Sequence, residues 1–80
     1  MDPEKIKTLI EQELEGASAS VVGDGRHYQA VIVCDAFDGK TIVEQHRMVF
    51  QALGDNMKEA IHALSLRTLT RAQHEQQQTG

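Results

Sequence analysis

Four histidines and one cysteine are the side chains of this 80-residue chain best suited to metal or acid–base chemistry. Histidine binds metal ions readily and changes its charge near neutral pH. His27 ends a glycine-rich turn that begins at Gly23, and His62 lies at the predicted junction between a short helix and a strand. A zinc or iron–sulfur site uses about four protein ligands, so two histidines provide half of one. Any metal site here would be completed by another chain; the alternative is that both histidines are solvated and inert.

The other candidate ligands have structural interpretations. His46 lies within the apolar stripe of a predicted helix, and we interpret it as a buried or half-buried structural residue; a surface contact is the alternative. Cys34 lies in a predicted strand, where a lone cysteine behaves as a small core residue. His74 belongs to a polar C-terminal segment and is expected to be inert.

Enzymatic motifs are absent from the sequence. Ser18, Ser20 and Ser65 lie in predicted strands without the sharp turn that exposes a nucleophilic serine. The turn at Gly23-Asp24-Gly25 lacks the lysine and the following helix of a phosphate-binding loop. A chain of this length buries only a modest core, so a deep active site is not expected. The sequence therefore predicts a protein that is not an enzyme and has no small-molecule substrate.

Composition restricts the remaining classes. The formal net charge of −4 argues against non-specific electrostatic binding of nucleic acid, which requires a basic surface. A single cysteine excludes an internal disulfide and indicates a reducing compartment. The sequence contains no signal-like or membrane-spanning apolar run. We expect a soluble cytoplasmic protein without a membrane partner.

Two long helices are predicted from apolar spacing. Asp2 and Pro3 are typical of an N-cap and first helical position, and the helix that follows ends near Gly16. The second helix starts at Lys40-Thr41 and ends at Gly54. Its predicted apolar arc consists of Ile42, His46, Val49 and Leu53, flanked by Val43 and Phe50. Asp55 is expected to cap a short third helix that runs through Met57 to Ile61.

Three strands complete the predicted fold. A weak strand over Ala17–Val22 and a strong one over Tyr28–Cys34 flank the glycine turn, which suggests a hairpin. Ala63–Thr70 alternates as a third strand, whereas residues 71–80 are polar and glutamine-rich and are predicted to be disordered. Residues 1–70 are thus expected to form one domain. Its fold class is α+β, a two-layer sandwich with a three-stranded sheet and helices on one face.

Three further motifs are Phe37-Asp38-Gly39-Lys40, the run Gln45–Val49 followed by Leu53, and Ile61-His62-Ala63-Leu64. With these motifs, about residues 3 to 70 of the sequence resemble the BolA family. The hairpin segment Gly23–Gln29 is similar to that of the bacterial IbaG-like branch in particular. The resemblance implies a class II KH-like fold with the order αββααβ and a mixed sheet.

The resemblance also implies a partner and a shared cofactor. Members of this family pair with monothiol CGFS-type glutaredoxins, and a [2Fe–2S] cluster bridges the two chains through thiolates of the glutaredoxin and of its glutathione. The BolA-like chain contributes a histidine before the last strand and a histidine or cysteine from the hairpin loop. His62 and His27 match these positions, and the loop of this chain has no cysteine. The isolated chain is expected to hold no cofactor.

Two other functions remain open at the level of sequence. A nucleic-acid-binding transcriptional regulator is favoured by the KH-like fold and by the helix-turn-helix-like pair around Gly54. Its basic face would use Lys40, Arg47 and Lys58, with Arg26 if the fold brings it near. A protein-interaction module without a metal is the third possibility.

Overall fold

The fold is that of a computed structural model, in which residues 2–57 and 63–78 are described. Helix α1 (Pro3–Glu13) is followed by strands β1 (Ser18–Gly23) and β2 (Tyr28–Val33), helix α2 (Ile42–Leu53), strand β3 (Leu64–Leu69) and helix α3 (Arg71–Gln78). Two short 3₁₀ turns, η1 (Asp35–Phe37) and η2 (Gly54–Met57), flank α2. Most of the predicted third helix falls on residues 58–62, outside the described residues.

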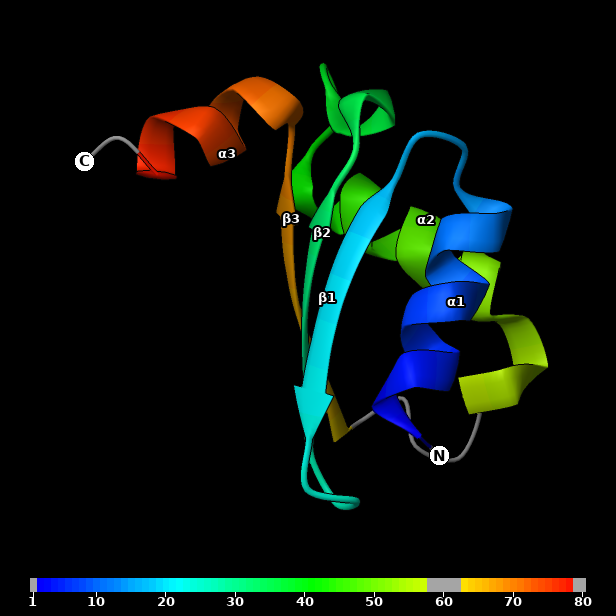
Figure 1. Cartoon of the computed structure of the whole chain (residues 1–80). Helices are drawn as coiled ribbons and strands as arrows, with labels where there is room; N and C mark the ends of the chain where they lie inside the picture. The colour runs from blue at the N-terminus through cyan, green and yellow to red at the C-terminus, as the bar shows by residue number, and fades with distance from the viewer. Residues whose placement is uncertain (1, 58–62, 79–80) are drawn as a thin grey trace.

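The three strands form one mixed sheet in the order β1-β2-β3. β1 and β2 pair as an antiparallel hairpin, and β2 and β3 pair in parallel. Figure 1 shows α1 and α2 packed side by side on one face of this sheet. The predicted α+β sandwich with a three-stranded mixed sheet is thereby confirmed.

Helix α1 starts as the sequence predicts. The Asp2 side chain accepts a hydrogen bond from the backbone N–H of Glu4 at 3.1 Å, and Pro3 occupies the first helical position. Ile6 and Ile10 are fully buried, because their spacing places them on the face that contacts the sheet. The helix ends at Glu13, and Gly16 takes a left-handed conformation with φ of 79° in the turn that leads to β1.

Helix α2 is rotated relative to the predicted wheel. Its buried residues are Gln45, Val49 and Leu53, whereas Ile42 is 59% exposed. His46 is half-buried, in agreement with its structural interpretation, but it is not at the centre of the buried face. The difference arises because the side-chain amide of Gln45 forms hydrogen bonds inside the core. Gln45 is therefore buried although it is polar, and the prediction, which used hydrophobicity alone, had placed Ile42 and His46 on the buried face instead.

The core lies between the sheet and the two helices. Its largest fully buried side chains belong to α1, β2, η1 and α2, and they include Phe37, Ile6, Ile10, Ile32, Leu53 and Val49. Aliphatic residues dominate, as the composition predicts. The third strand follows its predicted alternation, with Leu64 and Thr68 buried and Ser65 and Arg67 exposed.

The predicted disorder after residue 70 is wrong for residues 71–78, which form α3. Thr70 and Gln73 make a reciprocal capping pair: the Gln73 N–H donates to Thr70 Oγ1 at 3.2 Å, and the Thr70 N–H donates to Gln73 Oε1 at 2.8 Å. The Arg71 N–H also donates to Asp35 Oδ1 at 3.2 Å, which ties the start of the helix to η1. The prediction of disorder considered only the low hydrophobicity of the segment. Residues 71–78 form a helix because they are rich in helix-forming residues and have a capped N-terminus.

Candidate functional site

The hairpin that carries His27 is held in place by one carboxylate. Asp24 Oδ1 accepts hydrogen bonds from the N–H groups of Arg26 at 2.8 Å and His27 at 2.9 Å. The Asp24 N–H donates in turn to the His27 carbonyl at 3.2 Å. Gly25 supplies the left-handed residue of this turn, with φ of 92°. The backbone of His27 is thus fixed, while its side chain is exposed to solvent.

Asp24 also sets the charge next to His27. The hydrogen bonds from the His27 and Arg26 backbones, together with the charge of His27, hold the pKa of the Asp24 carboxyl below its ordinary value. The carboxylate is therefore ionised at neutral pH. A negative charge at this position attracts a cation that approaches the His27 side chain.

The base of the hairpin requires a glycine at position 23. A Cβ at Gly23 would lie 2.3 Å from Cδ1 of Tyr28 and 2.9 Å from the carbonyl oxygen of His27. Both distances are far shorter than van der Waals contacts, so the Tyr28 ring packs directly over the glycine backbone. Tyr28 is itself only 2% exposed. Packing below the turn and hydrogen bonds within it together position His27.

The parallel register brings the start of β3 to the same end of the sheet. Leu64 is paired with Tyr28, the residue that follows His27, and Leu66 is paired with Ala30. The first residues of β3 therefore lie at the end of the sheet that carries the His27 hairpin (Figure 1). His62 precedes Leu64 by two positions in the sequence and lies outside the described residues, as does Lys58.

Cys34 lies at the opposite end of β2 from His27. It is 2% exposed, and its Sγ donates a hydrogen bond to the Glu15 carbonyl at 3.6 Å. A strand of six residues spans about 20 Å, so the thiol and the His27 hairpin are well separated. The interpretation of Cys34 as a core residue is confirmed. His74 lies half-buried on α3, also away from the hairpin.

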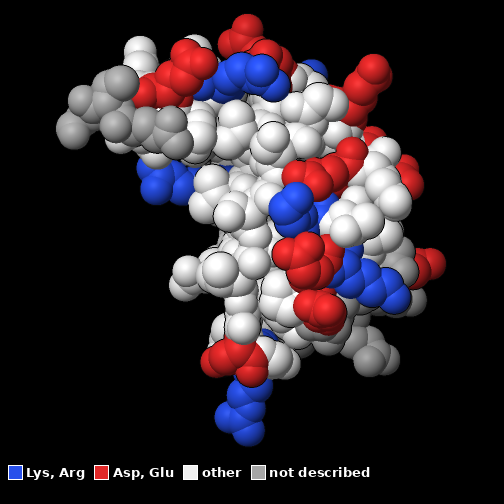
Figure 2. All heavy atoms as spheres, viewed as in Figure 1, with Lys and Arg blue, Asp and Glu red and all other residues white. Residues whose placement is uncertain are grey.

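The described basic residues do not gather on one surface. The pKa of the Glu44 carboxyl is lowered principally by the hydrogen bond that the Thr41 N–H donates to it. Lys40, before α2, and Arg47, within α2, are exposed and lower this pKa further, so the Glu44 carboxylate lies close to both charges. Arg26 lies in the hairpin, at the other end of the sheet. In Figure 2, blue and red spheres are interspersed over the visible face.

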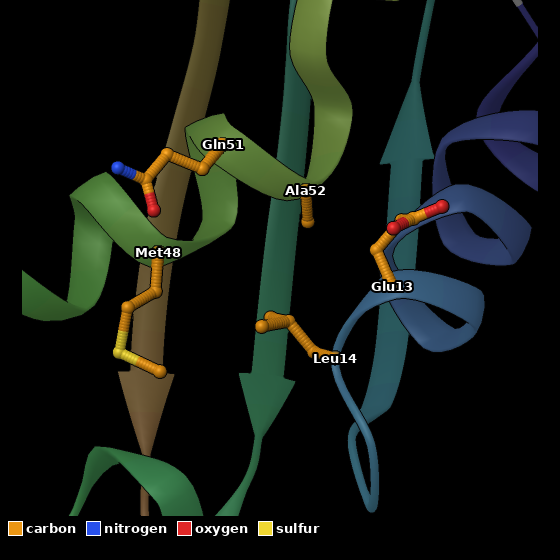
Figure 3. Close-up of a pocket in the computed structure, with 5 residues that line it drawn as sticks. All are labelled: Glu13, Leu14, Met48, Gln51 and Ala52. Carbon is orange, nitrogen blue, oxygen red and sulfur yellow. The ribbon is translucent and has the colours of Figure 1, made fainter.

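A hollow of about 300 Å³ lies between the end of α1 and the middle of α2. It is lined by Glu13 and Leu14 of the first helix and its end, and by Met48, Gln51 and Ala52 of the second (Figure 3). None of the predicted site residues lines it.

Within residues 2–57 and 63–78, no three His, Cys, Asp or Glu side chains are grouped so that they could hold a metal ion. The helices in that part of the chain are all too short or too polar to cross a membrane.

The protein is a small α+β domain with a three-stranded mixed sheet and two helices on one face of that sheet. It presents an exposed histidine at the turn between the first two strands. Residues 4–73 match the family described as BolA-like protein, and the chain belongs to the BolA family. The predicted family is thereby confirmed.

Curated relatives support this assignment. The chain is 38% identical to SufE-like protein 1 of Arabidopsis thaliana, in an alignment of 81 positions that covers 88% of this chain. It is 30% identical to the acid stress protein IbaG of Escherichia coli over 91% of this chain and 88% of that protein. The chain spans 22% of the SufE-like protein and 46% of another relative, the DNA-binding transcriptional regulator BolA of Escherichia coli, which is 35% identical over 60% of this chain.

A solved structure confirms the fold. The bolA protein homologue from Coxiella burnetii superimposes with a TM-score of 0.85 and 42% sequence identity, covering 94% of this chain and 97% of that chain. The agreement extends over nearly the whole length of both proteins, so it includes all three strands and the helices around them.

Proposed function

We propose that this chain is a non-enzymatic partner of a monothiol CGFS glutaredoxin and donates His27 and His62 to a [2Fe–2S] cluster shared between the two proteins. Its role would lie in iron–sulfur trafficking or in iron and stress signalling. The observation that carries the proposal is the parallel register of β2 and β3. It places Leu64, the first residue of β3, beside Tyr28, the residue that follows His27, and His62 precedes Leu64 by two positions in the sequence.

The His27 hairpin fits the role of a ligand donor. Its side chain is exposed, so an iron atom held by another chain can approach it. Its backbone is fixed by Asp24, which reduces the conformational entropy lost on binding. The carboxylate of Asp24 also compensates the positive charge that iron brings to the site. Cys34, in contrast, is buried at the far end of β2 and does not fit.

Histidine ligation has two chemical consequences. Relative to a site made of thiolates alone, imidazole ligands raise the reduction potential of a [2Fe–2S] cluster. Imidazole binds iron only in its neutral form, so the shared cluster is expected to be released as the pH falls. Both properties suit a carrier or a sensor better than a permanent structural site.

The test reconstitutes the complex from this chain, a CGFS glutaredoxin, iron, sulfide and glutathione. Visible absorption and circular dichroism are recorded for the wild type and for His27→Ala and His62→Ala. We expect a heterodimer spectrum distinct from that of the glutaredoxin homodimer, which both variants lose. His46→Ala is the matched control, because it removes an imidazole on α2 and should leave the spectrum unchanged. If His62→Ala retained the wild-type spectrum, the ligand assignment would be wrong.

Two alternatives have different expected results. A complex that forms without any cluster spectrum would indicate a metal-free interaction module. The name of the Escherichia coli relative favours transcriptional regulation through DNA. Against direct DNA binding, the carboxylate of Glu44 lies close to the charges of Lys40 and Arg47, and Arg26 lies at the other end of the sheet. Binding of a DNA duplex at physiological salt, weakening steeply as salt rises, would support that alternative.

A further inference from the structure

The central strand has the sequence of a strand covered on both faces. In a sheet with one solvated face, outward positions are normally polar. The outward positions of β2 are Gln29, Val31 and Val33, and two of these three are valines. Continuous runs such as Val31-Ile32-Val33, and parallel pairs such as β2 with β3, are typical of sheets buried on both sides. Yet α1 and α2 both lie on the other face (Figure 1).

We define the open face by two rows of outward residues across the sheet. The first row is Val22, Gln29 and Ser65, and the second is Ser20, Val31 and Arg67. Val22 is 61% exposed, and Val31 is half-buried. Ser20, which pairs with Val31 on β1, is small, so the backbone of another element can come close to the valine on that side.

A helix already packs on this side of the sheet, at one end only. Leu69 points outward by the alternation of β3, but it is 7% exposed. Figure 1 shows α3 on the side opposite α1 and α2, directly beyond the end of β3. The third outward row, which contains Leu69 and Val33, is therefore partly covered by α3, whereas the open face is not.

The charge of the open face differs from that of the whole chain. Arg67 is the only charged residue in the three strands, and all 12 carboxylates of the chain lie outside them. Among residues 2–57 and 63–78, no carboxylate forms an ion pair with Arg67. A guanidinium set among valines and serines is complementary to an apolar surface that carries one carboxylate.

The dimensions fit a single helix. Neighbouring strands are about 4.8 Å apart, so three strands present a face roughly 10 Å wide. A helix with its side chains has a diameter of about 10–12 Å. We propose that the open face binds one amphipathic α-helix of a partner protein, whose small apolar side chains cover Val22 and Val31 and whose carboxylate pairs with Arg67.

The probe is a synthetic 14-residue helical peptide with an alanine and leucine stripe and one central glutamate. Its twin carries lysine in place of that glutamate. Each is titrated into the ¹⁵N-labelled full chain without iron, and amide shifts are mapped by NMR. We expect the glutamate peptide to shift the amides of the open face and the lysine twin to bind about tenfold more weakly, since loss of a charged pair costs about this factor. Arg67→Glu should reverse the preference.

Two exposed valines provide a matched control. Val22 is 61% exposed and Val43, on α2, is 60% exposed. Val22→Glu should weaken binding of the glutamate peptide about tenfold, whereas Val43→Glu should leave it unchanged. Val22 and Arg67 are both exposed and lie on edge strands, so thermal melts of their variants should overlay that of the wild type. Arg47→Glu serves as the charge control on the helical side.

Several results would overturn the proposal. They are equal affinity for the two peptides, shifts centred on α2 or on the hollow beside α1, and no shift at a peptide concentration of about 1 mM. Concentration-dependent shifts of the open face without peptide would identify a second copy as its occupant. Displacement of the peptide by an oligonucleotide would identify nucleic acid. Peptide binding is expected to survive in His27→Ala, which separates this surface from the proposed ligand site.

Discussion

Replacement of Gln45 is expected to destabilise this domain more than its polar character suggests. Its amide nitrogen donates to the carbonyls of Phe37 at 3.1 Å and Lys40 at 3.0 Å, and its amide oxygen accepts from the hydroxyl of Thr68. Gln45 is 7% exposed and Thr68 is 6% exposed. One side chain thus joins the loop before α2 to β3 through three hydrogen bonds.

The magnitude follows from the groups left unpaired. Gln45→Leu preserves most of the volume, so the cavity term is small. It leaves the buried hydroxyl of Thr68 without its acceptor, at a cost of about 1–3 kcal/mol, and removes two bonds to carbonyls that retain other partners or water. We expect a loss of about 2–3 kcal/mol. This loss is large beside the free energy of unfolding of a domain of this size, roughly 4–12 kcal/mol. At about 4–8 °C for each kcal/mol, the melting temperature should fall by about 8–24 °C.

Urea unfolding of four proteins tests this reasoning: the wild type, Gln45→Leu, Thr68→Val and the double variant. In the Gln45→Leu background, Thr68→Val should raise the free energy of unfolding by about 1–2 kcal/mol, because two apolar side chains leave no polar group unpaired. In the wild-type background, the same substitution should lower the free energy of unfolding. Gln51→Leu, at an exposed position of the same helix, should change stability by less than about 0.5 kcal/mol. Equal effects of Thr68→Val in both backgrounds would refute the proposed coupling.

Three further predictions concern the hairpin, the sheet edge and the last helix. Gly23→Ala should cost about 1–3 kcal/mol and shift the NMR signals of Tyr28, because its Cβ has no room; Gly25→Ala provides a comparison limited to backbone strain. The Glu11 carboxylate accepts a hydrogen bond from the backbone N–H of Ala19 in β1 at 3.0 Å. The pKa of Glu11 is lowered by its hydrogen bond with Lys7 and by this bond from Ala19. The stabilisation from Glu11 is therefore complete above the ordinary pKa near 4.5 and is lost as the pH falls through the depressed value in the folded state. Glu11→Ala should cost about 0.5–1 kcal/mol in urea at pH 7, and this cost should shrink as the pH falls through that depressed value. Thr70→Ala should speed hydrogen exchange within α3, with little change in the exchange of the sheet, because it removes only the N-cap.

The elements with strong local signals were predictable from the sequence. Asp2 and Pro3 marked the start of α1, and the β-branched run in β2 marked the central strand. The signals that failed depend on side-chain hydrogen bonds. Gln45 is buried because partners from two other segments satisfy its amide, which a helical wheel does not record. Helix α3 depends on the Thr70–Gln73 capping pair, which a polar composition conceals.

The candidate site could be predicted only in part. Spacing and resemblance identified His27 and His62, but nothing in the sequence indicated that Asp24 would hold the His27 backbone. Arg26 and Lys40, two of the basic residues proposed for nucleic acid, are separated by the length of the sheet, because Arg26 precedes β2 and Lys40 follows it. The residues of the open face could not be assigned from the sequence alone, because they depend on the pairing register of the three strands.

The parallel pairing of β2 and β3 has a kinetic consequence. Gly23 and Tyr28 pair across a turn of four residues, whereas Tyr28 and Leu64 pair across an interval of 36 positions that includes α2. A hairpin closes in about 1–10 μs, and pairings between distant segments form later. During synthesis, both strands of the hairpin are translated before β3. The proposed ligand pair therefore requires the long-range pairing of β2 with β3, and a chain without this pairing would not hold His27 and His62 at the same end of the sheet.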